Sequence, residues 1–475
     1  MESPARRAAE IWLGAFIGLA GILVFLYPDG YQQDGGNHFL FARWAWIHPE
    51  LLVGVWSRPA FTLLYSLPAQ FGYPAAKLFT VGLCAVTAWQ TWRLAEHLGL
   101  ARSALAVPLL VLQPSFLLLC SDTLTEPLFA LIFVTALRLH HAGRVVSGML
   151  VASLMILARP EGFVLGVVWG AWILLVPRDP RPAWRRIPSV LLLASGAAAW
   201  WLAAWLISGD PLYIKHHWPP DWTATGAPYG SGPIWGYAAR LPEIAGRLLQ
   251  VPLVVGLAVL LARRRGGTLT SPVLAVLMIH SALWSFGGLG SAGYARYMVT
   301  VAPAMALIAL TGWNVIADRC ARLPRGVRIA SAGAVLAASA VFAAMYVDGW
   351  IYSRDARLIA ETHADFMKSP RPVKRLVWSQ AYMAILFDAD PWSAPTWGDR
   401  AKNLEIIAGL PSGTLVFWDD ETGPSWFHLT RADFQGAGFE LIISRGQALE
   451  GRFVKGRVLG FGGTRRQEMH LLYRP

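Results

Sequence analysis

The sequence is poor in cysteine and contains no internal repeat. Its 475 residues include only three cysteines, and Cys84, Cys120 and Cys320 lie far apart. Three scattered cysteines provide neither a disulfide framework nor the spacing of a metal site. No segment of about 20–50 residues recurs, which argues against a repeat architecture, and no low-complexity tract interrupts the chain.

Apolar residues are in excess. They make up 55% of the chain, against about 45–50% in soluble globular proteins. The excess lies in runs about as long as a bilayer is thick, roughly 20 residues each. The 23 tryptophans agree with this, because Trp collects at membrane interfaces. The composition therefore predicts a multi-pass membrane protein surrounded by membrane lipids.

The formal charge of +12 does not indicate a nucleic-acid partner. The arginines form short clusters between apolar runs, which is how membrane orientation signals are arranged. Arg6 and Arg7 precede the first apolar run, and no clean small-residue cleavage site follows it. This pattern predicts an uncleaved first span.

The fold class predicted is a mainly α membrane protein with about eleven transmembrane helices, followed by a small extracytoplasmic α/β domain. The apolar segment 59–71 contains Pro68 and is expected to be interfacial or re-entrant, not a span. The expected spans lie near 11–27, 73–95, 103–120, 124–141, 145–158, 161–176, 187–207, 250–262, 271–289, 297–316 and 328–347.

The basic residues predict the orientation. The short loops that follow every second span carry most of them, including the Arg263-Arg264-Arg265 run. The positive-inside rule then places the N-terminus in the cytoplasm and, with an odd number of spans, the C-terminus outside. The expected location is the inner (plasma) membrane of a cell envelope.

The composition changes near residue 351. Charged residues become more frequent, apolar runs shorten, and β-type stretches occur at 375–379, 414–418, 439–444, 453–459 and 467–473. Helix-like stretches at 355–367 and 399–408 lie between them. We therefore divide the chain into a transmembrane domain, 1–350, and an extracytoplasmic α/β domain, 351–475.

Six carboxylates of the transmembrane domain fall at or near the outer ends of spans: Asp29, Asp34, Asp122, Glu126, Glu161 and Asp210. A carboxylate near the hydrocarbon is costly unless it is paired or functional, so a shared cavity on that face is expected. Asp34 stands in an Asp34-Gly35-Gly36 turn after the first span. The two glycines would let the backbone bend closely around a substrate. Asp34 could act as a general base toward an acceptor hydroxyl, or it could simply cap a turn or helix.

Two short outer connections carry further candidates. In the segment SDTLTEP, Asp122 and Glu126 share a face if the segment is helical; they could hold a substrate hydroxyl or a divalent cation, or favour a helix N-terminus. In ARPEG, Arg159 beside Glu161 could bind a phosphate or form an ion pair within a helical hairpin.

A third candidate segment, GYARY, opens the span near 297. Arg296 offers a rigid fork of donors to phosphate oxygens, and Tyr294 and Tyr297 could flank a sugar or lipid headgroup. The alternative is an interfacial aromatic belt with a snorkelling arginine. In the C-terminal domain the acidic run 419–421 could bind metal, but it is more typical of a solvated turn.

Together these segments resemble the glycosyltransferases of the C superfamily (GT-C). The resemblance covers residues 1 to about 347 and rests on the acidic first outer loop, SDTLTEP, ARPEG and GYARY. Members are polytopic enzymes that take a sugar from a polyprenyl-phosphate carrier on the outer face. The sequence has Asp34-Gly35 where aminoarabinose transferases and protein O-mannosyltransferases commonly show Asp-Glu, and it lacks the Trp-Trp-Asp signature of oligosaccharyltransferases.

The resemblance implies a single inverting displacement with Asp34 as catalytic base. It implies that Asp122 is the second catalytic acidic position and that Arg58 and Arg296 contact the donor phosphate. It implies no metal or other cofactor, although a divalent cation remains open. The acceptor could be a glycan, a lipid or a protein, and the C-terminal domain is expected to help recognise it.

Two other functions remain to be weighed. A transporter or flippase of a lipid-linked saccharide would need inverted repeats or helices broken at the midplane, and the sequence shows neither. A non-catalytic scaffold would not need Asp and Arg residues at several outer span ends.

Overall fold

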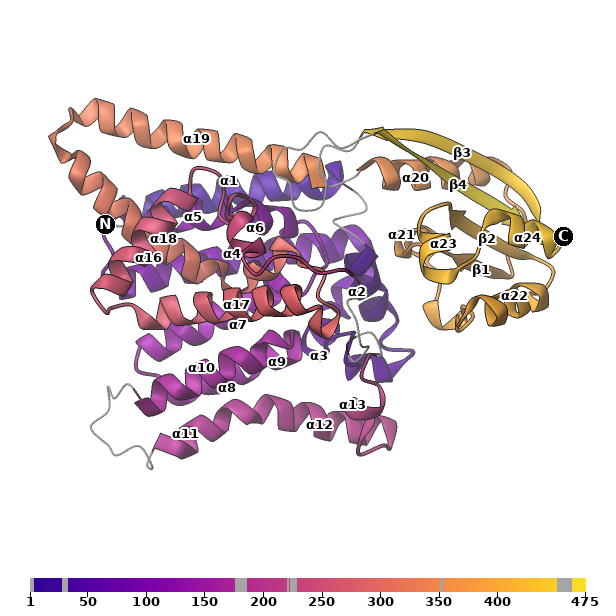
Figure 1. Ribbon diagram of the computed structural model, residues 1–475, viewed down its shortest axis with the longest axis horizontal. Coiled ribbons are helices and arrows are strands. Elements are labelled where there is room, and N and C mark those ends of the chain that lie inside the picture. Colours follow the sequence, from indigo (N-terminus) through magenta and orange to yellow (C-terminus); the bar gives the residue numbers. More distant parts are fainter. Residues whose placement is uncertain are drawn as a thin grey trace.

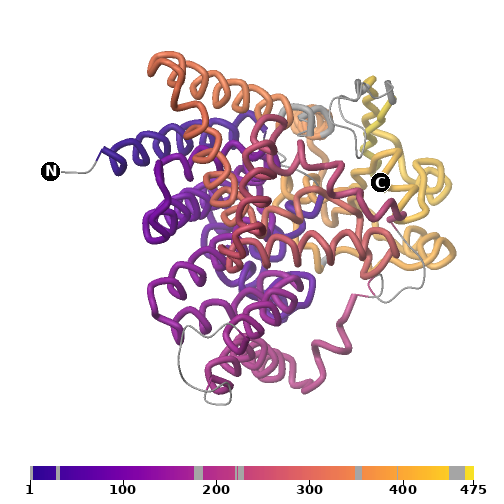
Figure 2. Tube along the Cα trace, turned by 60° about the vertical axis from the view of Figure 1, so that its left-hand side comes forward, coloured from indigo at the N-terminus to yellow at the C-terminus, as the bar shows by residue number. Residues whose placement is uncertain are grey.

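The computed structural model describes residues 4–27, 33–175, 186–219, 222, 229–350, 353–450 and 464–475. A helical body is followed by a smaller part built around a β-sheet (Figure 1). The chain begins at one end of the helical body, and the sheet lies beyond the opposite end (Figures 1 and 2). The predicted boundary at residue 350 falls between α19 (Arg325–Trp350) and α20 (Ser353–Lys368).

Each of the eleven predicted apolar segments falls on one helix or on consecutive helices. The α-helices of this body are α1 (Pro4–Leu26), α2 (Gln33–Trp44), α3 (Pro59–Tyr65), α4 (Tyr73–His97), α5 (Ala106–Val111), α6 (Pro114–Leu119), α7 (Glu126–His141), α8 (Val145–Ser153), α9 (Met155–Ala158), α10 (Glu161–Leu175), α11 (Ile187–Leu191), α12 (Ser195–Ser208), α13 (Tyr213–His216), α14 (Gly236–Ala239), α15 (Leu241–Ile244), α16 (Gln250–Ala262), α17 (Gly267–Phe286), α18 (Ala302–Arg319) and α19. Short 3₁₀ turns connect or extend them: η1 (Pro49–Leu52), η2 (Pro68–Phe71), η3 (Ser103–Leu105), η5 (Leu192–Ala194), η7 (Gly288–Gly290), η8 (Ala295–Val301) and η9 (Cys320–Arg322).

Fewer of these helices are long enough to cross a bilayer alone. By length and composition, five candidates stand among the described residues: Pro4–Leu26, Ile187–Ser208, Gly267–Phe286, Ala295–Arg322 and Arg325–Val347. Val145–Ala158, Glu161–Leu175 and Gln250–Ala262 are apolar but shorter. The chain is thus a multi-pass membrane protein, and the figure of eleven spans is not established.

Proline explains why one predicted span is divided into separate short helices. The predicted span 103–120 is divided into α5 and α6, and Pro114 is the first residue of α6. Proline has no backbone N–H to continue the preceding helix, but it fits the first turn of a new one. The segment 59–71 likewise gives only α3 and η2, each beginning at a proline.

Close helix packing in the body relies on small residues. A Cβ added to Gly256 of α16 would lie 1.9 Å from the Ile308 carbonyl oxygen of α18, and one added to Gly312 would lie 1.9 Å from the Pro252 carbonyl oxygen. The two backbones therefore touch at this crossing, as in membrane helix pairs built on small residues.

The C-terminal part contains one four-stranded sheet with helices on both faces. Strand order is β1-β2-β4-β3; β1 and β2 are parallel, and the other pairs are antiparallel. The elements are α20, β1 (Arg375–Trp378), α21 (Ala381–Leu386), η10 (Pro391–Ser393), α22 (Arg400–Gly409), β2 (Thr414–Asp419), α23 (Thr422–Phe427), α24 (Arg431–Gly436), β3 (Glu440–Glu450) and β4 (Thr464–Tyr473). The strand predicted at 453–459 lies outside the described residues.

Side chains alternate along β2, so that successive residues point to opposite faces of the sheet, and both faces are covered. Phe417 packs in an apolar cluster with Phe366 of α20, whereas Trp418 packs on the opposite face with Phe434 of α24. All six residues of β2 are buried, as expected for a central strand covered on two sides.

Candidate functional site

The helix α2 lies at the end of the helical body that faces the sheet (Figure 1). Asp34 is in its first turn, where a negative charge is favoured by the helix dipole. The carboxylate is 41% exposed, and its Oδ2 accepts a hydrogen bond from Arg296 Nη2 at 2.5 Å. The predicted base and the predicted phosphate ligand, 262 residues apart in the sequence, are therefore in direct contact.

Asp122 lies directly against the first turn of α2. A Cβ added to Gly35 would lie 2.3 Å from Asp122 Oδ1, so only glycine permits this approach. Thr123 Oγ1 donates to the Gly35 carbonyl oxygen at 2.7 Å, and Thr123 N donates to Asp122 Oδ1 at 2.7 Å. The two predicted acidic positions thus meet across one glycine.

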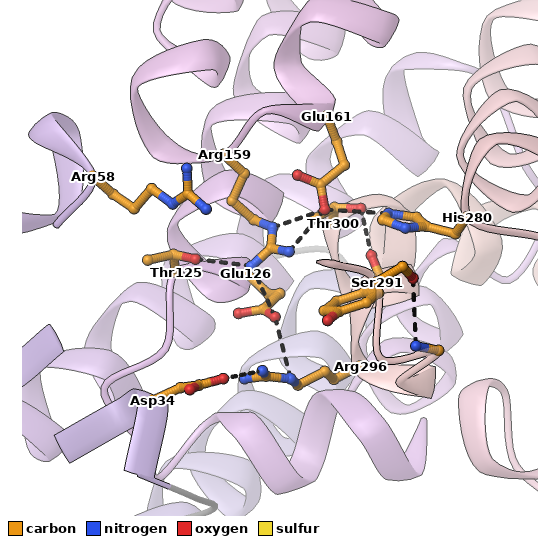
Figure 3. A network of polar contacts seen from close by, with 12 residues as sticks. Asp34, Arg58, Thr125, Glu126, Arg159, Glu161, His280, Ser291, Arg296 and Thr300 are labelled. Carbon is orange, nitrogen blue, oxygen red and sulfur yellow. Dashed lines mark hydrogen bonds and ion pairs between the residues drawn. The ribbon is translucent and has the colours of Figure 1, made fainter. Parts of the chain in front are cut away.

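Alternating charges extend inward from Asp34 (Figure 3). Glu126 Oε1 lies 3.7 Å from Arg296 Nε and 2.9 Å from Arg159 Nη1. Arg159 also donates to Glu161 Oε1 at 2.8 Å through Nη2 and to Thr125 Oγ1 at 3.0 Å through Nη1. We call the series Asp34–Arg296–Glu126–Arg159–Glu161 the ion-pair chain.

Apart from Asp34, the ion-pair chain is buried or, at Arg159, only 11% exposed. Glu126 has no exposed surface, and Arg296 is 5% exposed. Burying a charge is tolerated only when it is paired and hydrogen-bonded. The inner four residues therefore form a charged core whose members are paired with one another, and Asp34 is the most exposed member of the ion-pair chain.

Aromatic rings cover the two guanidinium groups. The Arg296 guanidinium lies 5.1 Å from the ring centre of Tyr294 and 5.6 Å from that of Tyr297. The Arg159 guanidinium lies 5.3 Å from the same Tyr297 ring. These cation–π contacts fix the arginines in orientation as well as in charge, and all three residues of GYARY that were predicted to bind substrate lie in this site.

Arg58 lies beside the ion-pair chain without joining it (Figure 3). Its guanidinium packs 4.8 Å from the Trp222 ring centre, and its Nη1 donates to the Val55 carbonyl oxygen at 3.1 Å. Among the described residues, no carboxylate lies within ion-pair distance of it. Its backbone φ is 63°, in the left-handed region, immediately before Pro59. Such strain costs about 1–3 kcal/mol and is concentrated at functional sites.

The formal charges of the cluster balance. Three guanidinium and three carboxylate groups contribute to it: Arg58, Arg159, Arg296, Asp34, Glu126 and Glu161. Desolvation raises the pKa of the Asp34 carboxyl, but the charge and hydrogen bond of Arg296, together with His38 and Arg159, outweigh it, so the pKa is lowered from its ordinary value. The outer carboxylate is therefore ionised at neutral pH.

His280 of α17 is a member of the site that the sequence analysis did not select. Its Nε2 lies 3.2 Å from Glu161 Oε1, and its ring stacks on Tyr297 with centres 4.8 Å apart. A histidine inside an otherwise apolar membrane segment is itself a signal of function, and this signal could have identified it.

The acidic run at the end of β2 is occupied by local structure. Asp419 accepts hydrogen bonds from Ser379 Oγ at 2.6 Å and from the backbone N–H groups of Glu421 and Thr422. Within the described ranges, no three His, Cys, Asp or Glu side chains gather in a way that could hold a metal ion.

The fold of the chain is shared with a solved structure. The chain is similar to the crystal structure of ArnT from Cupriavidus metallidurans bound to undecaprenyl phosphate, with a TM-score of 0.62 and 13% sequence identity over 97% of this chain and 98% of that one. It also matches the cryo-EM structure of the arabinofuranosyltransferase AftD from Mycobacteria, with a TM-score of 0.49 and 16% identity over 98% of this chain and 40% of that one. No protein-family model and no curated protein sequence matches the chain.

Proposed function

We propose that the chain is a membrane glycosyltransferase of the inner membrane. It moves a sugar from a polyprenyl-phosphate carrier to an acceptor hydroxyl on the extracytoplasmic face, with inversion at the sugar carbon. The observation that carries this proposal is the contact between the reachable carboxylate of Asp34 and the buried guanidinium of Arg296. A base and an anion-binding group are thus in hydrogen-bond contact with each other.

The arginines supply the contacts for the donor phosphate. Arg58 and Arg296 are both buried, held in place by aromatic rings, and lie in the same cluster. A guanidinium offers paired donors that match phosphate oxygens. ArnT, which shares the fold, was solved with undecaprenyl phosphate bound, and this supports a lipid phosphate as the carrier here.

The reaction proceeds as one displacement. The acceptor oxygen attacks the anomeric carbon while Asp34 takes the hydroxyl proton, and the bond between that carbon and the phosphate oxygen breaks. The electron pair leaves with the phosphate, and the arginines stabilise the charge that develops on it. The proposed mechanism requires no metal ion.

Donor binding also releases the base. In the structure Arg296 donates to Asp34, and the donor phosphate competes for the same N–H groups. Once the phosphate takes them, the Asp34 carboxylate loses the partner that lowers its pKa and becomes a stronger base. The order of binding is therefore donor first and acceptor second.

A lipid flippase is the second candidate, and one experiment separates the two. The purified chain is placed in vesicles that contain a polyprenyl-phosphate sugar labelled on both the lipid and the sugar. Cleavage of the sugar from the lipid, by transfer or hydrolysis, is expected. Movement of the intact lipid across the bilayer without cleavage would contradict the proposal.

A further inference from the structure

The helix α2, which carries Asp34, is held between two parts of the molecule. On one side, Gly35 lies against Asp122 of the helical body, where an added Cβ would be 2.3 Å from Oδ1. On the other side, Gly36 lies against Ala381 of α21, where an added Cβ would be 2.9 Å from the Ala381 Cβ. The two consecutive glycines thus contact different partners, one in each domain.

The contact with α21 belongs to the main hydrophobic core. Ala381 and Ala384 are buried in the same apolar cluster as Phe39 of α2 and Tyr73 of α4. Ile385 also packs against this cluster. The C-terminal domain is therefore joined to the helical body through a continuous core, with α21 as the joining helix.

Polar contacts hold both ends of α2 to the C-terminal domain. At its start, Gln33 Nε2 donates to Thr422 Oγ1 at 3.3 Å. At its end, Arg43 makes a two-pronged ion pair with Asp388, with Nε–Oδ1 at 3.0 Å and Nη2–Oδ2 at 2.7 Å. Asp388 lies in the turn that follows α21.

The segment that follows α2 is held by the same turn. His48 Nε2 lies 2.9 Å from Asp390 Oδ2, and the His48 ring stacks on Trp392 with centres 5.0 Å apart. A helix of twelve residues is marginal in isolation, so these neighbours decide where α2 lies.

We propose that the C-terminal domain positions the catalytic helix: α21 and the Asp388–Trp392 turn press α2 against Asp122 and so set the location of the Asp34 carboxylate. The inference rests on the proposed function. Ala381, Asp388 and Gly36 are then positioning residues, since none of them touches Asp34 or the ion-pair chain.

The packing at Gly36 gives the most direct test. In the variant Gly36→Ala the new methyl group meets the Ala381 Cβ on a helix backbone that has no flexible side chain to yield. The helix α2 must move by a fraction of an ångström to about 1 Å, and a misplacement of about 1 Å can lower a rate by about a hundredfold. We expect kcat for sugar transfer to fall by about tenfold or more.

The Michaelis constant separates positioning from other effects. Arg58 and Arg296 stand on elements other than α2, so KM for the polyprenyl-phosphate sugar should stay within about twofold. The double variant Gly36→Ala, Ala381→Gly removes the clashing methyl group from the other side and should restore kcat. A matched control is Gly436→Ala in α24, where nothing lies within 4 Å of an added Cβ, and it should leave kcat unchanged.

The ion pair at the far end of α2 provides an independent measurement. Asp388→Asn keeps the positive φ of 46° at that residue, since asparagine tolerates it. It removes the charge and replaces one of the two oxygens that accept from Arg43 by an N–H₂ group. We expect a smaller fall in kcat, of about twofold to fivefold, because an exposed pair contributes less than packing. The control is Arg400→Gln, which breaks a similar pair with Asp433 inside the C-terminal domain.

The outcomes are separable. If the wild type transfers no sugar, the proposed function fails and this inference fails with it. If the wild type transfers sugar and Gly36→Ala keeps wild-type kcat, only the positioning role is refuted. It is also refuted if Gly36→Ala is impaired and Ala381→Gly fails to restore it, or if Gly436→Ala and Arg400→Gln lower kcat as much as the interface variants.

Discussion

Replacing Glu126 by glutamine removes the negative charge that separates two buried guanidinium groups. Glu126 Oε1 lies 2.9 Å from Arg159 Nη1 and 3.7 Å from Arg296 Nε, and the side chain has no exposed surface. The amide has nearly the same shape, so the variant changes the charge and leaves the packing in place.

The expected loss of stability follows from these distances. Two unit charges about 4 Å apart attract by about 4 kcal/mol at an effective dielectric constant of about 20. Breaking a buried pair by removing one partner costs about 3–5 kcal/mol. The glutamine side chain keeps the packing but neither ion pair, so we expect the free energy of unfolding to fall by about 3 kcal/mol.

Stabilisation by polyprenyl phosphate distinguishes a phosphate-binding site from an ordinary buried ion pair. The Glu126→Gln variant has one surplus positive charge among its arginines, and a bound polyprenyl phosphate supplies the missing negative charge. The lipid should therefore raise the melting temperature of the variant more than that of the wild type, since a ligand that binds the native state stabilises it by mass action.

The matched control is Glu243→Gln. Glu243 is also buried, at 2% exposure, and it is paired with Arg240 at 3.8 Å and with Tyr346 at 3.3 Å, outside the ion-pair chain. This variant should lose stability without any gain in its response to polyprenyl phosphate. Equal melting temperatures for Glu126→Gln and the wild type, or equal responses to the lipid, would refute our account of the charged core.

Three further results are expected. Arg58→Gln should raise KM for the polyprenyl-phosphate sugar by about tenfold or more, because it removes a charged hydrogen bond to the donor worth about 1.5–3 kcal/mol. The melting temperature should change little. Steady-state kinetics with varied donor concentration measure the change in KM. Gly35→Ala should lower kcat by at least about tenfold, because the new Cβ would lie 2.3 Å from Asp122 Oδ1 and a shift of the Asp34 carboxylate by about 1 Å is costly. Kinetics at saturating donor measure this effect, and wild-type turnover would contradict it. Arg296 helps to lower the pKa of Asp34, so the acid limb of the kcat/KM profile should lie below the ordinary Asp value of about 3.9. In Arg296→Gln this limb should move to higher pH. A limb that does not move would exclude Asp34 as the titrating base.

Much of the helical body could be predicted from hydropathy. All eleven apolar segments fall on helices because a helix is the only open structure that satisfies its own backbone within a membrane. Their number as spans could not be predicted. Pro114 divides one segment into short helices, and three further apolar helices are too short to cross a bilayer alone.

The site was predicted in its parts but not in its pairing. Asp34, Asp122 and Arg296 were selected from local motifs, and the structure brings them together. That Glu126 contacts substrate stays a prediction; the structure places it, buried, between Arg159 and Arg296, which come from different parts of the chain. Its pairing depends on tertiary contacts, which no local spacing encodes.

The role of the two glycines after Asp34 was only half predicted. Their flexibility was expected to let the backbone bend around a substrate. The structure instead shows Gly35 and Gly36 making room for Asp122 and Ala381. The second of these contacts joins residues from the two ends of the sequence, so it could not be inferred before the domains were placed together.

The catalytic role of Asp34 is tested most directly by kcat for sugar transfer in Asp34→Asn, measured with purified protein and a polyprenyl-phosphate sugar. A general base contributes about 10²–10⁴-fold to the rate, which is about 3–5 kcal/mol of transition-state stabilisation. The carboxylate is 41% exposed, and exposed ion pairs contribute little to folding, so the melting temperature should be nearly unchanged. We predict that kcat falls at least about a hundredfold in a protein that is as stable as the wild type; near-normal turnover would contradict the assignment.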